Sequence, residues 1–172
     1  MDSNRIEKRI LLRAPLERVW QAISDSGQFG RWFGAAFNGP FLAGRPLTGK
    51  IVGTAVDPEV AKLQKPHEGK TIELWVEKIE PMRTISFRWH PFAVSAEVDY
   101  SKEPTTLIVF QLEPMGSSTQ LTITESGFDQ LPLARRAEAF RANDGGWAHQ
   151  LTLIEKYLAI VAKSDVKGDV KG

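Results

Sequence analysis

The stretch that decides the fold is FDQLPLARRAEAFRANDGGWAHQLTLIEKYLAIVAK, residues 128–163. It is the one segment long and periodic enough to predict a long helix. Four apolar residues follow Trp147 at spacings of three and four: Leu151, Ile154, Leu158 and Val161. This spacing places them on one stripe of a helix with 3.6 residues per turn. Such a stripe needs a large apolar partner, and a sheet curled around the helix is the simplest one.

The composition is that of a globular domain. The chain has 172 residues, of which 42% are hydrophobic and 25% charged, with a formal net charge of +1. This balance encodes no overall attraction to nucleic acid or to an anionic membrane, so neither is expected as a partner. No apolar run approaches the roughly 20 residues of a membrane span, and the first ten residues lack the apolar core of a signal peptide. We therefore expect a soluble cytoplasmic protein.

The cysteine count excludes several kinds of site. With no cysteine, the chain can form no disulfide, thiol nucleophile, cysteine-ligated zinc site or ordinary iron–sulfur cluster. The three histidines, His67, His90 and His149, are scattered and form no HExxH pair. We predict no metal and no cofactor, although carboxylate ligands for a metal stay open. His67 and His149 are expected on the surface.

Upstream of the long helix the sequence indicates mostly strands. The predicted elements, in order, are a strand at 5–12, a helix at 15–24, a short helix or turn at 25–34, a hairpin within 37–56, a loop at 57–69 with room for one helical turn, strands at 70–80 and 83–90, a connection at 91–104, and strands at 105–113 and 119–125. The final residues, 164–172, lack apolar content, and we expect a disordered tail there.

Alternation within the strands predicts which side chains face the helix. One inward row ends in a carboxylate, because Leu121, Ile123 and Glu125 share a face. Glu125 is either an acid within a pocket or already in solvent, and we favour solvent because strand ends are usually wet. By the same parity Trp75 and His90 point outward.

Four stretches, in order, carry a family resemblance: PLERVWQAISDSGQFGRWFG, VEKIEPMRTISFRW, TQLTITESGF and GWAHQLTLIEKYL, within about residues 6–158. They resemble the activator-of-Hsp90-ATPase-homologue-1-like (AHSA1-like) proteins, a branch of the START/Bet v 1-like (SRPBCC) superfamily. The resemblance implies an α+β helix-grip fold in one domain, residues 1–163. That fold has a curled antiparallel sheet of six or seven strands, two short helices and a long C-terminal helix.

A narrower resemblance concerns FRWHPFAV, DYSKEPTTL and GFDQLPLARR, which look like bacterial proteins labelled as vanillate O-demethylase oxidoreductase-like. An oxidoreductase partner of that kind needs a flavin site and a cysteine-ligated cluster. The sequence has no cysteine and no glycine-rich dinucleotide fingerprint for these groups.

The helix-grip resemblance implies a cavity between sheet and helix that relatives use to hold apolar small molecules. The expected lining residues are Trp32, Phe33, Val76, Phe87, Trp89, Phe110 and Ile123, with Arg136, Phe140, Asn143 and Trp147 from the helix. The alternative is that such rows form a close-packed core, which is the norm for protein interiors.

The glycine pair at 145–146 decides how the helix is used. If the helix continues through it, the stripe extends back to Asn143 and Arg136, which would orient a polar or anionic end of an apolar ligand. The alternative, which we slightly favour, is a kink at the glycines that leaves both side chains in water.

The leading functional hypothesis is binding of an apolar or amphipathic small molecule without dedicated chemistry. One alternative is a cavity enzyme of cyclase, dehydratase or hydrolase type, in which Glu125, His90 or Arg136 takes an acid–base or oxyanion role. Another is a module that contacts an Hsp90-type chaperone and stimulates its ATPase. The ligand, the oligomeric state and whether a reaction is catalysed stay open.

Overall fold

A computed structural model describes residues 4–91 and 99–171, with side chains as far as Lys163. The connection predicted at 91–104 lies partly outside this range. The elements are β1 (Arg5–Leu12), α1 (Leu16–Ser24), α2 (Ser26–Phe33), β2 (Ala35–Phe37), β3 (Pro46–Ile51), α3 (Pro58–Gln64), β4 (Thr71–Glu80), β5 (Thr84–Trp89), β6 (Thr106–Met115), β7 (Ser118–Ser126) and α4 (Leu133–Lys171), with 3-10 turns η1 (Lys65–His67), η2 (Tyr100–Lys102) and η3 (Phe128–Gln130).

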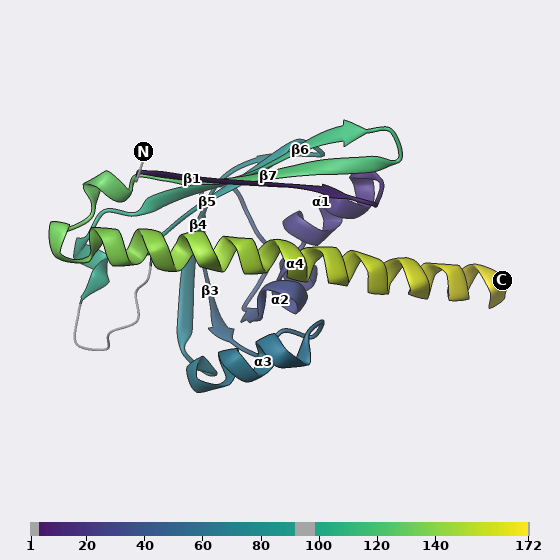
Figure 1. The fold of residues 1–172 in the computed structure, drawn as a ribbon, viewed down its shortest axis with the longest axis horizontal. Helices are drawn as coiled ribbons and strands as arrows, with labels where there is room; N and C mark the ends of the chain where they lie inside the picture. Colours follow the sequence, from purple (N-terminus) through teal and green to yellow (C-terminus); the bar gives the residue numbers. More distant parts are fainter. Residues whose placement is uncertain (1–3, 92–98, 172) are drawn as a thin grey trace.

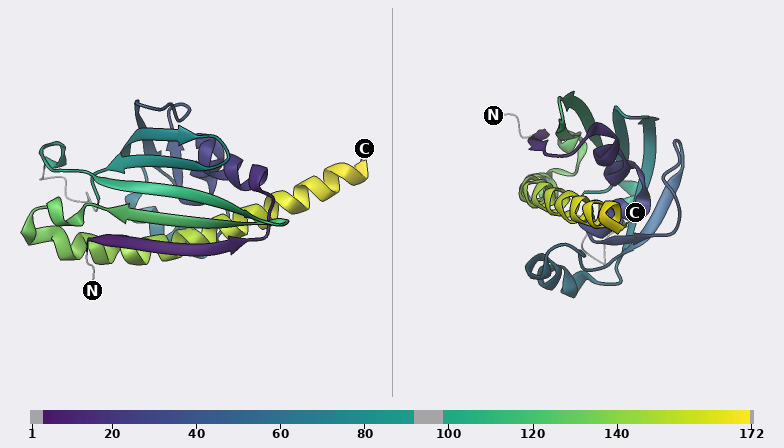
Figure 2. Two further views of the ribbon diagram at one scale, coloured as in Figure 1. Left: turned by 90° about the horizontal axis from the view of Figure 1, so that it is seen from above. Right: turned by 90° about the vertical axis from the view of Figure 1, so that its right-hand side faces the viewer.

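The strands form one antiparallel sheet of seven in the order β1-β7-β6-β5-β4-β3-β2. In the end-on view of Figure 2 the strands make an arc, and α4 lies along its open side. The helices α1 and α2, which connect the two edge strands β1 and β2, pack against α4 near one end of the sheet (Figure 1). The predicted α+β helix-grip fold is confirmed.

The inward rows follow the predicted parity. Leu74 and Val76 of β4 and Phe87 of β5 are buried, whereas Trp75 between them is 36% exposed. A bulge between Val76 and Lys78 shifts the register of β4 against β5, which bends the strand locally. One face of the sheet therefore supplies the apolar surface that the stripe of α4 requires.

Aromatic rings fill much of the space beneath the sheet. Phe29 of α2 is the centre of this cluster, with ring centroids 4.6–5.8 Å from those of Trp32, Phe41, Phe87 and Phe110. Trp32 is fully buried, and its indole N–H donates to the carbonyl of Ala22 at 2.9 Å. This region is close-packed, as protein interiors usually are.

The loop predicted at 57–69 is more regular than expected. It contains α3, whose first turn is capped by the Asp57 carboxylate, which accepts from the backbone N–H groups of Glu59 and Val60. Pro58 occupies the first turn, where its missing N–H costs nothing. The expected single helical turn is a seven-residue helix, because this cap and proline start a helix that shows little apolar periodicity. Asp57 also pairs with Lys156, which ties the segment to α4.

The long helix α4 is continuous. It spans 39 residues and passes through Gly145 and Gly146 without a break, so the kink that we slightly favoured is absent. Its final turns, in the segment predicted as a tail, project beyond the sheet (Figure 1). Within the described residues no helix is both long and apolar enough to cross a bilayer.

A continuous helix makes Gly145 replaceable by a better helix former. Gly145 is exposed, and a Cβ added there would meet no atom within 4 Å. We expect Gly145→Ala to raise the free energy of unfolding by about 0.5–1 kcal/mol, measured by urea denaturation, because glycine loses more backbone entropy than alanine in a helix. The matched control, Ala142→Gly on the same exposed helix surface, should lower it by a similar amount. A loss of stability in Gly145→Ala would show that α4 departs from helical geometry at the glycine pair.

Candidate functional site

A fully buried carboxylate lies near the end of β7. Glu125 faces inward as its parity predicts, and its side chain is inaccessible to solvent. The favoured expectation, that the carboxylate emerges into water, was wrong. The strand end is not wet because α4 crosses it, bringing Asn143 and Trp147 against the carboxylate.

Five hydrogen bonds reach the two oxygens of Glu125. Oε2 accepts from Trp89 Nε1 of β5 at 2.8 Å and from Thr106 Oγ1 of β6 at 2.6 Å. Oε1 accepts from Trp147 Nε1 of α4 at 2.7 Å. Asn143 Nδ2 donates to both oxygens, at 2.9 and 3.1 Å. Glu125 thus connects three strands with the helix.

All these partners are electrically neutral. An isolated buried carboxylate is strongly unfavourable unless hydrogen bonds replace its hydration. Within the described part of the chain no lysine, arginine or histidine pairs with Glu125. Indole N–H groups can only donate, so at these contacts the carboxyl group acts as an acceptor, as an ionised carboxylate does. Neutral donors take the place of a counter-ion.

A small cavity adjoins this cluster. The rings of Trp89 and Trp147 stack with centroids 5.8 Å apart, and Phe33 lies 6.4 and 6.3 Å from them. These three rings, with Asn143, Gly146 and Gln150, line a cavity of about 70 Å³. Its walls are therefore mainly aromatic.

One buried polar atom of the cavity is an acceptor without a partner among the described residues. Gln150 Nε2 donates to the carbonyl of Phe33 at 3.4 Å, which fixes the orientation of the amide. Gln150 Oε1 is buried and has no hydrogen-bond partner among the described residues. Asn143 Nδ2 lies within hydrogen-bond distance of both oxygens of the Glu125 carboxylate, a contact that one shared N–H hydrogen makes, so Asn143 keeps its Oδ1 acceptor and a second amide hydrogen.

Gly146 leaves the cavity open. A Cβ added at this position would meet no atom within 4 Å, and the residue is exposed at the surface of α4. A side chain at this position would begin in open space beside the cavity lining. The glycine therefore contributes room beside Trp147 rather than a bend in the helix.

Comparison with known proteins identifies the family. A family model described as "Activator of Hsp90 ATPase homolog 1-like protein" matches residues 13–159. The chain belongs to this AHSA1-like family. No curated protein matches the sequence of this AHSA1-like chain.

Solved structures share the fold of this AHSA1-like protein. A solution structure of a protein from Arthrobacter aurescens has a TM-score of 0.69 at 18% identity, covering 92% of this chain and 89% of that one. Protein MLL2253 from Mesorhizobium loti has a TM-score of 0.66 at 17% identity, with 90% and 96% covered. The Aha1 dimer from Colwellia psychrerythraea has a TM-score of 0.61 at 20% identity, with 90% and 95% covered. At these identities the likeness establishes the SRPBCC helix-grip fold alone.

The residues predicted to line a cavity separate into two groups in this AHSA1-like chain. Phe33, Trp89, Asn143 and Trp147 lie together around the cavity. The others from the sheet and α2 are packed in the core and do not line it: Trp32, Val76, Phe87, Phe110 and Ile123. Phe140 packs against Phe128, with centroids 5.2 Å apart. Period-two alternation predicted the inward direction correctly, but many rings meet there and leave no space.

The predicted catalytic constellation does not assemble. The guanidinium of Arg136 donates to the carbonyl of Leu131, just before α4, and takes no part in the cavity. His90 packs edge-on against Trp75, with ring centroids 6.1 Å apart. Among the described residues, the pockets found are not lined by Glu125, His90 and Arg136 together, so the structure does not bring these three side chains to one site.

Three residues of the site were missed, although the sequence carried a signal for each. Thr106 stands on the inward row of Ile108 and Phe110, so its hydroxyl was available to Glu125 by parity. Gln150 lies three residues after Trp147, on the same helical stripe. Gly146 was considered only as a possible kink.

Replacing the carboxylate tests its structural role. We expect Glu125→Gln to lower the free energy of unfolding by about 2–4 kcal/mol, because the N–H₂ group that replaces one oxygen meets one indole N–H and the Asn143 amide, which lose an acceptor. The measurement is urea denaturation followed by tryptophan fluorescence. Glu138→Gln, at an exposed position on α4, is the control and should change stability by no more than about 0.5 kcal/mol. A Glu125→Gln protein as stable as this control would contradict the assignment.

Proposed function

We propose that the protein binds a small amphipathic molecule whose apolar end enters the cavity between Trp89 and Trp147. The observation that carries this proposal is an aromatic-walled cavity that contains a buried, unpaired acceptor, Gln150 Oε1. Ligand sites are typically apolar hollows with a few placed polar groups. The cavity beside Trp89 and Trp147 likewise has apolar aromatic walls and a polar acceptor, although its volume is small.

The size of the cavity limits what enters it. Its volume of about 70 Å³ is roughly half that of the ~150 Å³ apolar cavity known to hold benzene. A short alkyl group or the edge of one ring is therefore the part of the ligand that enters. The remainder lies outside, over the surface of α4 beside Gly146.

The polarity of the cavity selects a hydrogen-bond donor. Gln150 Oε1, which has no partner among the described residues, accepts a hydroxyl or N–H group. The Glu125 carboxylate lies behind Asn143 without a cationic partner, which disfavours an anion. Of the polar or anionic ligand end expected at Arg136 and Asn143, this proposal keeps the polar form, as a neutral or cationic donor, and leaves out Arg136.

The role of Glu125 in this function is to position the walls. Oε1 accepts two hydrogen bonds and Oε2 accepts three. Since these donors already occupy both oxygens, we assign the carboxylate to fixing Trp89 and Trp147 rather than to proton transfer.

A pair of adjacent substitutions tests the site. Native mass spectrometry of the purified protein should reveal a retained small molecule, and hexan-1-ol should shift the tryptophan fluorescence with a saturable dependence. Gly146→Leu should fill the cavity and weaken hexan-1-ol binding by about tenfold or more. Gly145→Leu, one residue away, adds the same side chain to the same helix outside the cavity lining and should leave binding unchanged.

Two results would refute the proposal. One is equal binding of hexan-1-ol by the Gly146→Leu and Gly145→Leu proteins. The other is equal binding of hexan-1-ol and of methyl hexyl ether, which has no donor, because the acceptor of Gln150 would then play no part.

Family membership supplies a second candidate function. The matching family model is named after activators of the Hsp90 ATPase, and one structural neighbour is an Aha1 dimer. If this protein acts in the same way, the ATPase rate of an Hsp90-type chaperone rises when the protein is added. A rate that is unchanged at saturating protein removes this candidate and leaves ligand binding untouched.

A further inference from the structure

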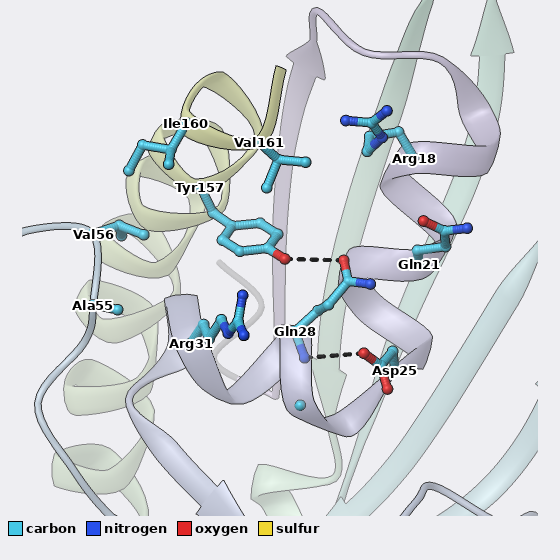
Figure 3. Close-up of a pocket in the computed structure, with 11 residues that line it drawn as sticks. Arg18, Gln21, Asp25, Gln28, Arg31, Ala55, Val56, Tyr157, Ile160 and Val161 are labelled. Atoms are coloured by element: carbon cyan, nitrogen blue, oxygen red, sulfur yellow. Dashed lines mark hydrogen bonds between the residues drawn. The ribbon is translucent and has the colours of Figure 1, made fainter. Parts of the chain in front are cut away.

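A second concavity lies on the other half of α4. It is a groove of about 750 Å³ between α1, α2 and the C-terminal part of the helix, and Figure 3 shows its lining. Tyr157, the first α4 residue of the groove, follows Gln150 of the aromatic cavity by seven positions, so the two hollows are separated by roughly 10 Å along the helix axis. The groove volume falls within the range of about 300–1,000 Å³ of small-molecule sites.

The polar floor of the groove is centred on Tyr157. This residue is only 5% exposed, and its hydroxyl donates to Gln28 Oε1 at 3.0 Å. Burial raises the pKa of Tyr157, and the charges of Arg31 and Arg18 act in the opposite direction. Two guanidinium groups from different helices therefore lie near one fixed, neutral hydroxyl.

Two guanidinium groups and the amide of Gln28 supply hydrogen-bond donors to the groove. Arg18 of α1 and Arg31 of α2 face it, and among the described lining residues Asp25 is the one acid. The Asp25 carboxylate accepts from the backbone N–H of Gln28 and so caps α2. The amide of Gln28 gives its oxygen to Tyr157, which leaves its N–H₂ as a further donor. Anionic oxygens are acceptors that suit these donors.

The opposite wall is apolar. Val56, Ile160 and Val161 line it, and Ile160 is 47% exposed. The ion pair between Asp57 and Lys156 holds the Val56 segment against α4. The two parts of the apolar wall, Val56 and the α4 residues, are therefore attached to each other. An aliphatic chain placed here covers apolar surface that is otherwise in water.

We propose that this groove is a second binding site and that its ligand is an amphipathic organic anion. The carboxylate head lies between Arg18 and Arg31, whose planar guanidinium groups match carboxylate geometry. The aliphatic part lies along Val56, Ile160 and Val161. This site is independent of the aromatic cavity in position, and its charge preference is opposite.

The test uses decanoate, below the concentration at which it forms micelles, as the probe. Calorimetric titration should show saturable binding, and methyl NMR should show shifts at Val56, Ile160 and Val161. Decan-1-ol and decyltrimethylammonium have the same chain without the negative charge and should bind about tenfold more weakly or worse.

Substitutions of the arginines test the head-group contacts. Arg31→Gln and Arg18→Gln should each weaken decanoate binding about tenfold, and Arg31→Lys should lose less because the charge is kept. The control is Arg13→Gln, which removes an exposed arginine between β1 and α1 that does not line the groove. It should leave the affinity unchanged.

Three results would overturn this proposal: decanoate affinity unaffected by both arginine substitutions, equal affinity for decan-1-ol, or NMR shifts confined to the surroundings of Trp89 and Trp147. The Gly146→Leu protein separates the two sites, because it should lose hexan-1-ol binding and retain decanoate binding. Failure at one site is thus read independently of failure at the other.

Discussion

One constraint governs the arrangement of the sheet and α4: the Glu125 carboxylate is removed from water without a cation to neutralise it. Such a group is tolerated only where donors surround it. Its donors come from β5, β6 and α4. The positions of β5, β6 and β7 in the sheet and the distance of α4 from the sheet must therefore both allow these donors to reach the carboxylate. The rings of Trp89 and Trp147 stack as a direct result, because the two indoles donate to the two oxygens of one carboxylate, Trp89 to Oε2 and Trp147 to Oε1.

The helix α4 serves as a common wall for two hollows of different chemistry. Toward its N-terminal end it presents Asn143, Gly146 and Gln150 to a small aromatic cavity that offers an acceptor. Toward its C-terminal end it presents Tyr157 and Ile160 to a wider groove with two arginines. Between them the helix packs on the core with Leu151 and Ile154 buried. A continuous helix is what keeps these two sites apart and rigid.

Local rules predicted the directions of side chains but not their surroundings. The period of two placed Glu125 inward, and the period of 3.6 placed Asn143 on the same face as Trp147, because both follow from backbone geometry. Whether Glu125 is exposed to solvent depends on where α4 crosses the end of β7. This contact joins residues that are far apart in the sequence, and no local pattern predicts it. Arg136 was misplaced for another reason: its long side chain has many rotamers and folds back to the Leu131 carbonyl. The core position of Phe87 likewise depends on rings from several elements.

The distances along the chain between Glu125 and its donors have a consequence for folding. Trp89 lies 36 residues from Glu125 in sequence and Asn143 lies 18 residues away, so no single hairpin or helix brings the donors together. The complete set of hydrogen bonds forms only after β5, β6 and β7 are paired and α4 has docked. Interactions that form late stabilise the native state more than the transition state. The buried carboxylate therefore acts mainly on the lifetime of the folded protein, by slowing the detachment of α4, and little on the rate at which the sheet assembles.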